Sequence, residues 1–295
     1  MKNNVSDIVL EKIKRHPCYN SKAHDYARMH IPVAPKCNIQ CNYCNRKYDC
    51  VNESRPGVTS GVLSPEEAAA KYTYVKENIK NLSVVGIAGP GDALENFEET
   101  RKSIELIKET DEDVIFCMST NGLRLPEYAE EMISLGVEHV TVTMNAVDPE
   151  IGAKIYEFVY DGEKKLTGIE GASLLLERQL EGIKILVENN ILCKVNIVYI
   201  KGVNDHHIEE VVKKARELGV FMTNIMPLIP TKDTKFESIS PLPGSELKEM
   251  RDKCGQHIKQ MYHCQQCRAD AIGQLKNDRS SEFRSFGCAM RDKMA

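Results

Sequence analysis

The feature that most constrains the fold is a regular alternation of apolar and amphipathic segments after residue 29. Apolar runs, each expected to form a strand, occupy 30–35, 82–89, 113–120, 139–147, 191–200 and 220–229. Segments with helical patterning follow at 64–79, 95–110, 125–136, 171–190, 208–219 and 244–258. Strands that alternate with helices at this spacing form parallel sheets, and near-continuous apolar runs are typical of strands covered on both faces. The sequence therefore predicts an α/β fold with six β/α units.

Six such units can form an open doubly wound sheet or an incomplete barrel. In both architectures the functional side chains lie beyond the carboxyl ends of the strands. We divide the chain into an N-terminal arm (1–29), a (β/α)6 barrel (30–258) and a C-terminal extension (259–295) that bears cysteines but no clear core-forming pattern. A long connection at 45–63 does not fit the alternation, and loops of this length are usually functional or disordered.

Charge and cysteine content narrow the class of protein. The chain has 39 Lys and Arg and 43 Asp and Glu, and its net charge of −4 argues against a nucleic-acid surface. No apolar run approaches the roughly 18–20 residues that cross a bilayer, and the charged N-terminus does not resemble a signal peptide. We therefore expect a cytoplasmic protein with no membrane or nucleic-acid partner. It has 11 cysteines, and those that cluster in the sequence are expected to be metal ligands or redox groups rather than disulfides.

Three cysteines form one compact motif directly after the first predicted strand. Cys37, Cys41 and Cys44 are spaced as Cys-x3-Cys-x2-Cys, and Tyr43 precedes the last of them. Three thiolates on one loop can hold three irons of a 4Fe–4S cluster, which leaves the fourth iron open to a substrate or cofactor. The alternative is a zinc site or a structural iron–sulfur site with a fourth ligand from elsewhere in the chain.

This motif, placed after the first strand of a β/α chain, resembles that of the radical S-adenosylmethionine (SAM) superfamily. The resemblance implies that the open iron chelates SAM, which one electron from the cluster cleaves to a 5′-deoxyadenosyl radical. We therefore expect the six units to form a partial TIM-type barrel with SAM at the strand ends. The candidate SAM contacts are Gly89, Asp92, Ser119, Thr120, Asn145 and Asn196. The turn at 89–92, Gly-Pro-Gly-Asp, matches the family's Gly-Gly-Glu-like turn only in part, and Ser-Thr-Asn-Gly at 119–122 is also an ordinary turn sequence.

Eight further cysteines remain, and some of them have the character of ligands. Cys264 and Cys267 have ligand spacing, and an arm that crosses the barrel mouth can bring Cys18 to them as a three-cysteine site. A second site of two cysteines and one histidine would combine Cys117 at the end of the third strand, Cys50 in the long loop and His24 in the arm. On residue type alone, Cys117 is equally typical of a buried core thiol.

The other cysteines and two further histidines have simpler interpretations. Cys193 lies within an apolar strand and Cys254 within a helix, where buried structural thiols are expected. Cys288, near residue 295, is expected to be a free thiol. His16 is expected to position the arm and His30 to pack at the start of the first strand, so neither is predicted as a ligand.

Longer stretches resemble the NifB family of nitrogenase cofactor maturases. They are 16–58, AGPGDAL at 88–94, MNAVDPEIGAKIY at 144–156 and HCQQCRADAIGQL at 263–275, and the resemblance covers nearly the whole chain. It implies that two further 4Fe–4S clusters bind as substrates and are fused into an eight-iron, nine-sulfur cluster around a central carbide. The ligands that it implies are Cys18, Cys264 and Cys267 for one cluster and His24, Cys50 and Cys117 for the other.

The same resemblance implies a mechanism and a set of partners. One SAM donates its methyl group to a sulfide of a substrate cluster, and a second SAM yields the radical that abstracts a hydrogen from that methyl group. The catalytic candidates are Cys50 and Glu53, the latter as a base, with Asp25 as a weaker choice. The implied partners are an iron–sulfur cluster donor, a carrier or scaffold protein and a low-potential electron donor, in an anaerobic cytoplasm. Because the chain stops at 295 without room for the carrier domain of many relatives, we expect hand-off to a separate protein.

Two alternatives remain open at the level of sequence. The first is another radical SAM enzyme with auxiliary clusters, such as a molybdenum-cofactor cyclase or a peptide-modifying enzyme. Those enzymes keep auxiliary ligands mostly in the C-terminal region, whereas Cys18 and His24 lie in the N-terminal arm. The second is a non-catalytic iron–sulfur carrier or a zinc-binding structural module, which would not need six β/α units with polar strand ends.

Overall fold

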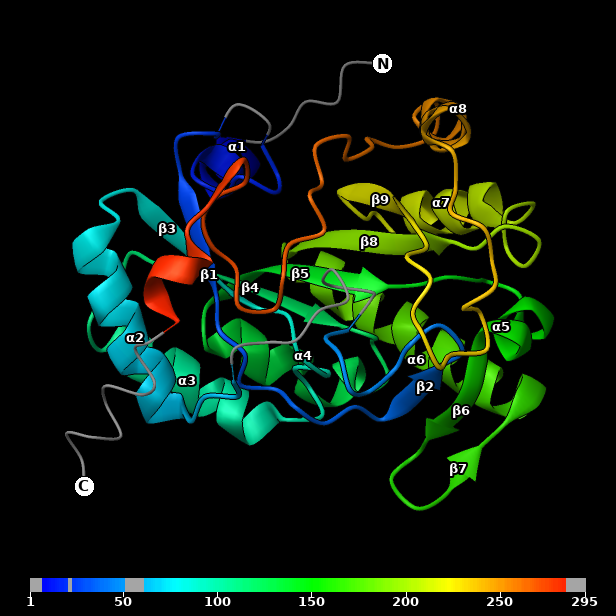
Figure 1. Ribbon diagram of the computed structural model, residues 1–295, viewed down its shortest axis with the longest axis horizontal. Helices are drawn as coiled ribbons and strands as arrows, with labels where there is room; N and C mark the ends of the chain where they lie inside the picture. Colours follow the sequence, from blue (N-terminus) through cyan, green and yellow to red (C-terminus); the bar gives the residue numbers. More distant parts are fainter. Residues whose placement is uncertain (1–6, 21–22, 51–60, 285–295) are drawn as a thin grey trace.

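The computed structural model describes residues 7–20, 23–50 and 61–284, with an eight-stranded sheet at its centre (Figure 1). Its parallel strands are β1 (Ala27–His30), β3 (Leu82–Ile87), β4 (Ile115–Thr120), β5 (Val137–Thr143), β8 (Leu192–Tyr199) and β9 (Met222–Pro227). The helices of the six units are α2 (Pro65–Asn78), α3 (Phe97–Lys108), α4 (Leu125–Ser134), α6 (Gly168–Glu188), α7 (Ile208–Glu217) and α8 (Gly244–Cys254). The predicted α/β class and its parallel sheet are confirmed.

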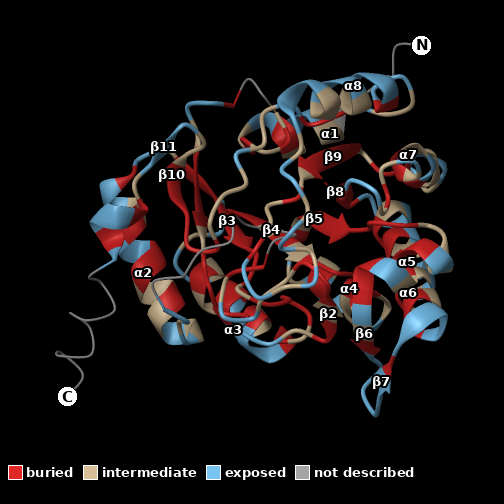
Figure 2. Cartoon of the chain, turned by 45° about the vertical axis from the view of Figure 1, so that its right-hand side comes forward, coloured by how far each residue is buried: buried red, intermediate tan, exposed pale blue. Residues whose placement is uncertain are grey.

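Within the described residues the sheet is open rather than closed into a complete barrel. The strand order is β11-β10-β1-β3-β4-β5-β8-β9, so that β11 and β9 are the two outer strands. Every residue of β3 and of β8 is buried, as expected for strands covered on both faces, and Figure 2 shows exposed residues gathered on the outer surfaces of the helices. This arrangement is the partial TIM-type barrel that the sequence predicts.

The first strand begins earlier than its predicted start at residue 30. Strand β1 covers Ala27–His30, and the chain leaves the sheet just before Pro32. Because proline has no N–H, it cannot take a place in a central ladder, and the apolar run at 31–35 therefore continues as irregular chain. The predicted boundary between arm and barrel falls at the end of this strand, which places His30 at its carboxyl end instead of its start.

The C-terminal extension adds strands to the sheet, although its sequence shows no core-forming pattern. Strand β10 (Ile272–Gln274) pairs antiparallel with β1, and β11 (Asn277–Asp278) pairs with β10. Elements of two or three residues are too short to produce a detectable alternation of apolar and polar side chains. The segment that bears Cys264 and Cys267 runs across the sheet from α8 to β10 (Figure 1), and the pairing of β10 with β1 fixes its far end.

A second, three-stranded antiparallel sheet was not expected from the sequence. Strand β2 (Ile39–Cys41) pairs with β6 (Tyr156–Tyr160), which pairs with β7 (Lys165–Leu166). Helix α5 (Pro149–Ile155) leads directly into β6. Because β2 lies inside the cysteine motif, this small sheet anchors the motif to a segment more than 100 residues away in sequence.

Local sequence signals set the start of α2. The Ser64 hydroxyl accepts a hydrogen bond from the Glu67 backbone N–H at 3.1 Å, and the Glu67 carboxylate accepts one from the Ser64 N–H at 2.8 Å. This reciprocal pair is the capping box that the sequence predicts. In the arm, α1 (Asp7–Lys14) precedes the sheet. None of the described helices has the length and apolar character to cross a membrane.

Candidate active site

A short turn gathers the thiols of the cysteine motif. The Cys44 N–H donates to the Cys41 carbonyl at 3.0 Å, and the Gln40 side-chain amide donates to the carbonyls of Cys44 at 2.7 Å and Cys41 at 3.0 Å. The thiols of Cys37, Cys41 and Cys44 line one cavity of about 340 Å³, open space included, together with that of Cys50. We call this space the loop cavity. Its thiols match the predicted three-cysteine motif, with Cys50 as an addition.

The loop cavity combines a buried, protonated thiol with a nearby cation. Burial, with a smaller contribution from Asp92, raises the pKa of the Cys37 thiol to about 12, so that binding of a metal there releases its proton. Partial burial disfavours the charge of Arg46, but the neighbouring thiols of Cys37 and Cys44 outweigh this effect and raise the pKa of Arg46. Three soft sulfur donors on one cavity beside a guanidinium fit an iron–sulfur cluster.

The Gly-Pro-Gly-Asp turn clamps the chain just ahead of Cys37. The Gly91 N–H donates to the Ala34 carbonyl at 2.5 Å, and the Asp92 N–H donates to the Lys36 carbonyl at 2.8 Å. The Asn96 side chain donates to the same Lys36 carbonyl at 2.9 Å and accepts from the Lys36 N–H at 3.1 Å. A Cβ on Gly91 would collide with the Lys36 carbonyl oxygen, so this approach requires glycine.

Asp92 and Thr120, both predicted as SAM contacts, tie two strand ends to each other. The buried Asp92 carboxylate accepts hydrogen bonds from the Asn121 N–H at 2.6 Å, the Leu94 N–H at 2.9 Å and the Thr120 hydroxyl at 3.0 Å. Burial raises the pKa of Asp92, and these hydrogen bonds oppose the shift. The Asn121 amide in turn donates to the Asn38 side chain at 2.7 Å, which carries the network into the cysteine loop.

The other residues predicted to contact SAM lie in different parts of the structure. The Asn145 side chain accepts from the Val198 N–H at 2.8 Å and donates to the buried Tyr43 hydroxyl at 2.7 Å, so it joins β8 to the cysteine loop. Gly89 has a left-handed backbone with a φ of 135°. Ser119 and Asn196 line a second cavity. Their contact with SAM stays a prediction.

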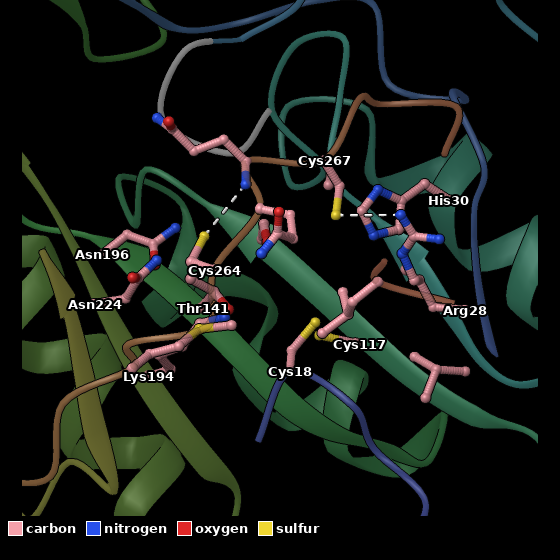
Figure 3. A pocket seen from close by; sticks show the side chains of 18 of the residues that line it. Cys18, Arg28, His30, Cys117, Thr141, Lys194, Asn196, Asn224, Cys264 and Cys267 are labelled. Atoms are coloured by element: carbon pink, nitrogen blue, oxygen red, sulfur yellow. Dashed lines mark hydrogen bonds between the residues drawn. The ribbon is translucent and has the colours of Figure 1, made fainter. Parts of the chain in front are cut away.

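The second cavity brings together four cysteines from three parts of the chain that are far apart in sequence. Cys18 from the arm, Cys117 from β4, and Cys264 and Cys267 from the C-terminal extension line a space of about 650 Å³, open space included (Figure 3). We call it the barrel cavity. Burial raises the pKa of Cys18 to about 11, while Lys194 nearby opposes the shift. The structure thus places the predicted three-cysteine set on one cavity and adds Cys117 to it.

Two buried cations share the barrel cavity. Arg28 on β1 is 2% exposed, and its Nη2 donates to the Cys267 Sγ at 3.3 Å. Its guanidinium also donates to the Gly273 carbonyl at 2.5 Å and lies 3.6 Å from the Asp278 carboxylate. Lys194 on β8 is 7% exposed. Neither side chain was singled out from the sequence, because a single basic residue in a strand gives no signal of its own.

The second predicted ligand set, His24 with Cys50 and Cys117, is not brought together. Cys117 lines the barrel cavity and Cys50 the loop cavity. His24 is exposed and lines neither of them. The grouping of these three residues as ligands of one cluster stays a prediction.

The barrel cavity instead contains His30 and His16, neither of which was predicted as a ligand. The His30 Nδ1 lies 2.9 Å from the Arg268 carbonyl oxygen, a contact that makes Nδ1 the donor and leaves a lone pair on Nε2. Burial lowers the pKa of His30 to about 4, so the ring is neutral. A Cβ on Gly86 would lie 2.7 Å from the His30 ring, so glycine makes room for it. A correct start for the first strand would have revealed His30 at a strand end.

His16 is held beside Cys18. Its Nδ1 accepts the Cys18 N–H at 3.2 Å, and its Nε2 has no hydrogen-bond partner among the described residues. Its ring lies 4.5 Å from that of His139. Burial, together with the neighbouring His139, lowers the pKa of His16 well below its ordinary value. The predicted role of His16 in positioning the arm accords with its backbone contact to Cys18.

Three of the remaining predicted residues, Cys193, Cys254 and Asp25, line neither cavity. Cys193 and Cys254 are buried, as expected of structural thiols. Asp25 is exposed, while Glu53 and Cys288 lie outside the described residues. Across 7–20, 23–50 and 61–284, no group of three or more His, Cys, Asp or Glu is arranged to hold a single metal ion.

Comparison with known protein families decides between the classes of iron–sulfur protein. Residues 31–215 match the profile of the Radical SAM superfamily. The chain belongs to the radical SAM superfamily. Its fold is also similar to that of solved structures with bound S-adenosylmethionine: anSMEcpe with bound AdoMet aligns with a TM-score of 0.56 at 17% identity, over 80% of this chain and 64% of that chain. SuiB of Streptococcus suis bound to S-adenosylmethionine aligns with a TM-score of 0.55 at 14% identity, over 88% of this chain and 56% of that chain.

Within the radical SAM superfamily the chain is similar to proteins named FeMo cofactor biosynthesis protein NifB. The protein from Bradyrhizobium diazoefficiens is 52% identical over 281 residues, which cover 93% of this chain and 56% of that protein. The protein from Klebsiella pneumoniae is 48% identical over 95% of this chain and 61% of its own length, and that from Azotobacter vinelandii is 48% identical over 95% and 57%. The resemblance predicted from the cysteine pattern is confirmed. The chain spans a little more than half the length of these relatives.

Proposed function

We propose that this radical SAM protein acts in the biosynthesis of the nitrogenase FeMo cofactor, where it fuses two 4Fe–4S substrate clusters around a carbide. The barrel cavity is the observation that carries the proposal. Four thiols and a neutral imidazole from distant parts of the chain line one space. Similarity to NifB proteins over more than nine-tenths of the chain supports the same role.

The resident cofactor would be held by Cys37, Cys41 and Cys44. A 4Fe–4S cluster bound there supplies the electron for reductive cleavage of SAM. The chain's own contribution is to fix the loop: the Gln40 amide holds the turn between the last two thiols, and the Gly91–Asp92 turn holds Lys36. Arg46, which lines the loop cavity, would offset the charge of the thiolates.

The two substrate clusters would bind in the barrel cavity. Cys18, Cys264 and Cys267 remain the proposed ligands of one of them. For the other we retain Cys117, which lines the barrel cavity, and Cys50, which lines the neighbouring loop cavity in the iron-free chain, and we propose His30 in place of His24 because His30 shares the barrel cavity with Cys117. The bond of the His30 Nδ1 to a backbone carbonyl is the second contact that metal-binding histidines usually make.

The proposed reaction balances with two SAM molecules and one added sulfide. Methyl transfer breaks the S–CH3 bond of one SAM, forms a bond from carbon to a cluster sulfide and releases S-adenosylhomocysteine. One hydrogen atom of the methyl group ends in 5′-deoxyadenosine, and the other two leave as protons. Reduction of the remaining carbon to carbide takes three electrons, which the substrate clusters and the external donor supply. Glu53 and Cys50 stay candidates for moving the protons.

The proposed reaction requires partner proteins that deliver clusters, sulfide and electrons and that accept the product. A cluster donor must supply the two substrate clusters, a sulfur donor the ninth sulfide, and a low-potential protein the electrons. A carrier or scaffold protein must accept the product. We place these exchanges in an anaerobic cytoplasm, because exposed iron–sulfur clusters are destroyed by oxygen.

Iron counting after anaerobic reconstitution tests the proposal. The proposed ligand sets predict three clusters and about twelve irons per chain. Cys18→Ala and Cys264→Ala should each lose about four irons, whereas Cys254→Ala, which removes a buried thiol on α8, should lose none. Wild-type iron content in both ligand variants would show that the barrel cavity holds no cluster.

The products of SAM and the identity of the nitrogen ligand provide two further tests. Turnover should yield both S-adenosylhomocysteine and 5′-deoxyadenosine, and formation of only one of them would exclude the two-fate reaction. His30→Ala should remove a nitrogen coupling from the pulsed EPR spectrum of the reduced clusters, while the matched change His24→Ala should leave it. The reverse result would restore His24 as the ligand.

A further inference from the structure

Two histidines line the barrel cavity, and their backbone contacts run in opposite directions. The His30 Nδ1 lies 2.9 Å from the Arg268 carbonyl oxygen, so this nitrogen carries the proton. At His16 the relation is reversed, because the Cys18 backbone N–H donates to Nδ1 at 3.2 Å. A ring nitrogen that accepts an N–H has no proton of its own, so the proton of His16 is on Nε2. The two imidazoles are therefore held in opposite tautomers on one cavity.

Packing holds the His16 ring in this orientation. The centre of the ring lies 4.5 Å from that of His139 and 4.7 Å from that of Tyr19. The Tyr19 hydroxyl in turn donates to the carbonyls of Val140 on β5 and Leu192 on β8, at 3.3 and 3.2 Å. The His16 side chain is thus tied to the central sheet as well as to the backbone of Cys18. A donor on this ring is presented in one direction.

The Nε2–H of His16 is a buried donor that the fold leaves unused. His16 is 1% exposed, and its Nε2 has no hydrogen-bond partner among the described residues. Buried polar groups nearly always have a partner, because a donor removed from water without a new acceptor is costly. A bound molecule that brings an acceptor would satisfy this N–H. Because His16 and Cys18 line the same cavity, a molecule held by the Cys18 thiol would lie next to this imidazole.

We propose that the His16 Nε2–H donates a hydrogen bond to a sulfide of the substrate cluster held by Cys18, Cys264 and Cys267. This proposal rests on the proposed function and gives the two histidines of the cavity different tasks. His30 presents a lone pair on Nε2 and binds iron, whereas His16 presents a proton and binds sulfide. A hydrogen bond to a cluster sulfide stabilises the more negative, reduced form and raises the reduction potential.

An EPR-monitored redox titration of the full-length chain, reconstituted anaerobically with isotope-labelled histidine nitrogen, tests this proposal. The signal that Cys18→Ala removes identifies the cluster in question. In the wild type this signal should carry a weak coupling to labelled nitrogen, smaller than that of a histidine bound to iron, because a hydrogen bond separates the ring from the cluster. The reference for a bound histidine is the His30 coupling described above.

Two variants separate the two contacts of His16. The amide of His16→Asn lies near the position of Nδ1, so it can accept the Cys18 N–H but does not reach the place of Nε2. The longer His16→Gln carries an amide N–H to that place. We expect His16→Asn to lower the midpoint potential by about 59 mV, a tenfold change in the ratio of reduced to oxidised cluster for one electron, and His16→Gln to stay near the wild type. His206→Asn, which replaces a side chain that is 66% exposed, should leave both the potential and the coupling unchanged.

The outcomes separate this inference from the proposed function. A signal that depends on Cys18 but lacks the weak nitrogen coupling would overturn the hydrogen bond, and so would an unchanged potential in a His16→Asn chain with full iron content. Loss of about four irons in His16→Gln but not in His16→Asn would overturn it too, because only the acceptor for the Cys18 N–H would then matter. If neither variant keeps its iron, the coupling in the labelled wild type decides. A wild-type chain with no signal that depends on Cys18 would instead reject the proposed function.

Discussion

The contact between Gly91 and the cysteine loop gives a prediction whose size can be worked out from the structure. In Gly91→Ala the new methyl group would collide with the Lys36 carbonyl oxygen, which is backbone and cannot rotate away. Overpacking of this kind costs about 1–3 kcal/mol. Moving the turn away also weakens the hydrogen bonds to Ala34 and Lys36, each worth about 0.5–1.5 kcal/mol. We expect the free energy of unfolding to fall by about 2–6 kcal/mol.

Urea unfolding of the iron-free full-length chain, followed by circular dichroism, measures this change. Gly244→Ala is the matched control, because nothing lies within 4 Å of a Cβ at that position. We also expect Gly91→Ala to bind fewer irons, since the displaced turn no longer fixes the chain ahead of Cys37. A variant within about 0.5 kcal/mol of the wild type and with its full iron content would refute the argument, because ordinary surface changes fall in that range.

Three further predictions concern the strand ends. Asp92→Asn should destabilise the fold by about 1–3 kcal/mol through a lost acceptor. Because burial raises the pKa of Asp92, the folded chain holds the proton of this carboxyl group more tightly than the unfolded chain does. The stability advantage of the wild type over Asp92→Asn should therefore shrink as the pH rises above 3.8. An advantage that grows instead would contradict the assignment. Asn145→Ala leaves the Val198 N–H and the Tyr43 hydroxyl without this partner, so the free energy of unfolding in urea should fall by about 2–5 kcal/mol. A fall of less than about 1 kcal/mol would argue against the network. Gly86→Ala should displace the His30 ring and abolish the nitrogen coupling in pulsed EPR, and a retained coupling would mean that the ring does not bind a cluster.

Local patterns were sufficient to predict most of the fold. The six strands and six helices of the sheet follow from apolar runs and helical periodicity, because these reflect short-range constraints on side-chain spacing. Ser64 and Glu67 marked the start of α2 for the same reason. The elements that were missed, such as β2 and β10, have only three residues each and depend on partners distant in sequence.

The contents of the two cavities could be predicted only in part. The spacing of Cys37, Cys41 and Cys44 was enough to define the loop, since all three ligands lie within the short stretch 37–44 and line one cavity. The juxtaposition of Cys18 with Cys264 was suggested by the sequence, and the structure places both on the barrel cavity. Neither spacing nor residue type distinguishes His30 from His24, because both lie in the same short stretch before the motif.

By itself, the sequence determined the kind of fold, the position of the cysteine loop and the family to which the chain belongs. Only the tertiary structure decided which thiols, histidines and cations face the same space. The pairing of β10 with β1 brings Cys267 to Arg28, and the end of β1 turns His30 toward Gly86. These contacts depend on strand order and on the path of irregular segments across the sheet, which no local periodicity encodes. The physical reason is that ligands of a site are neighbours in space, whereas sequence patterns record neighbours along the chain.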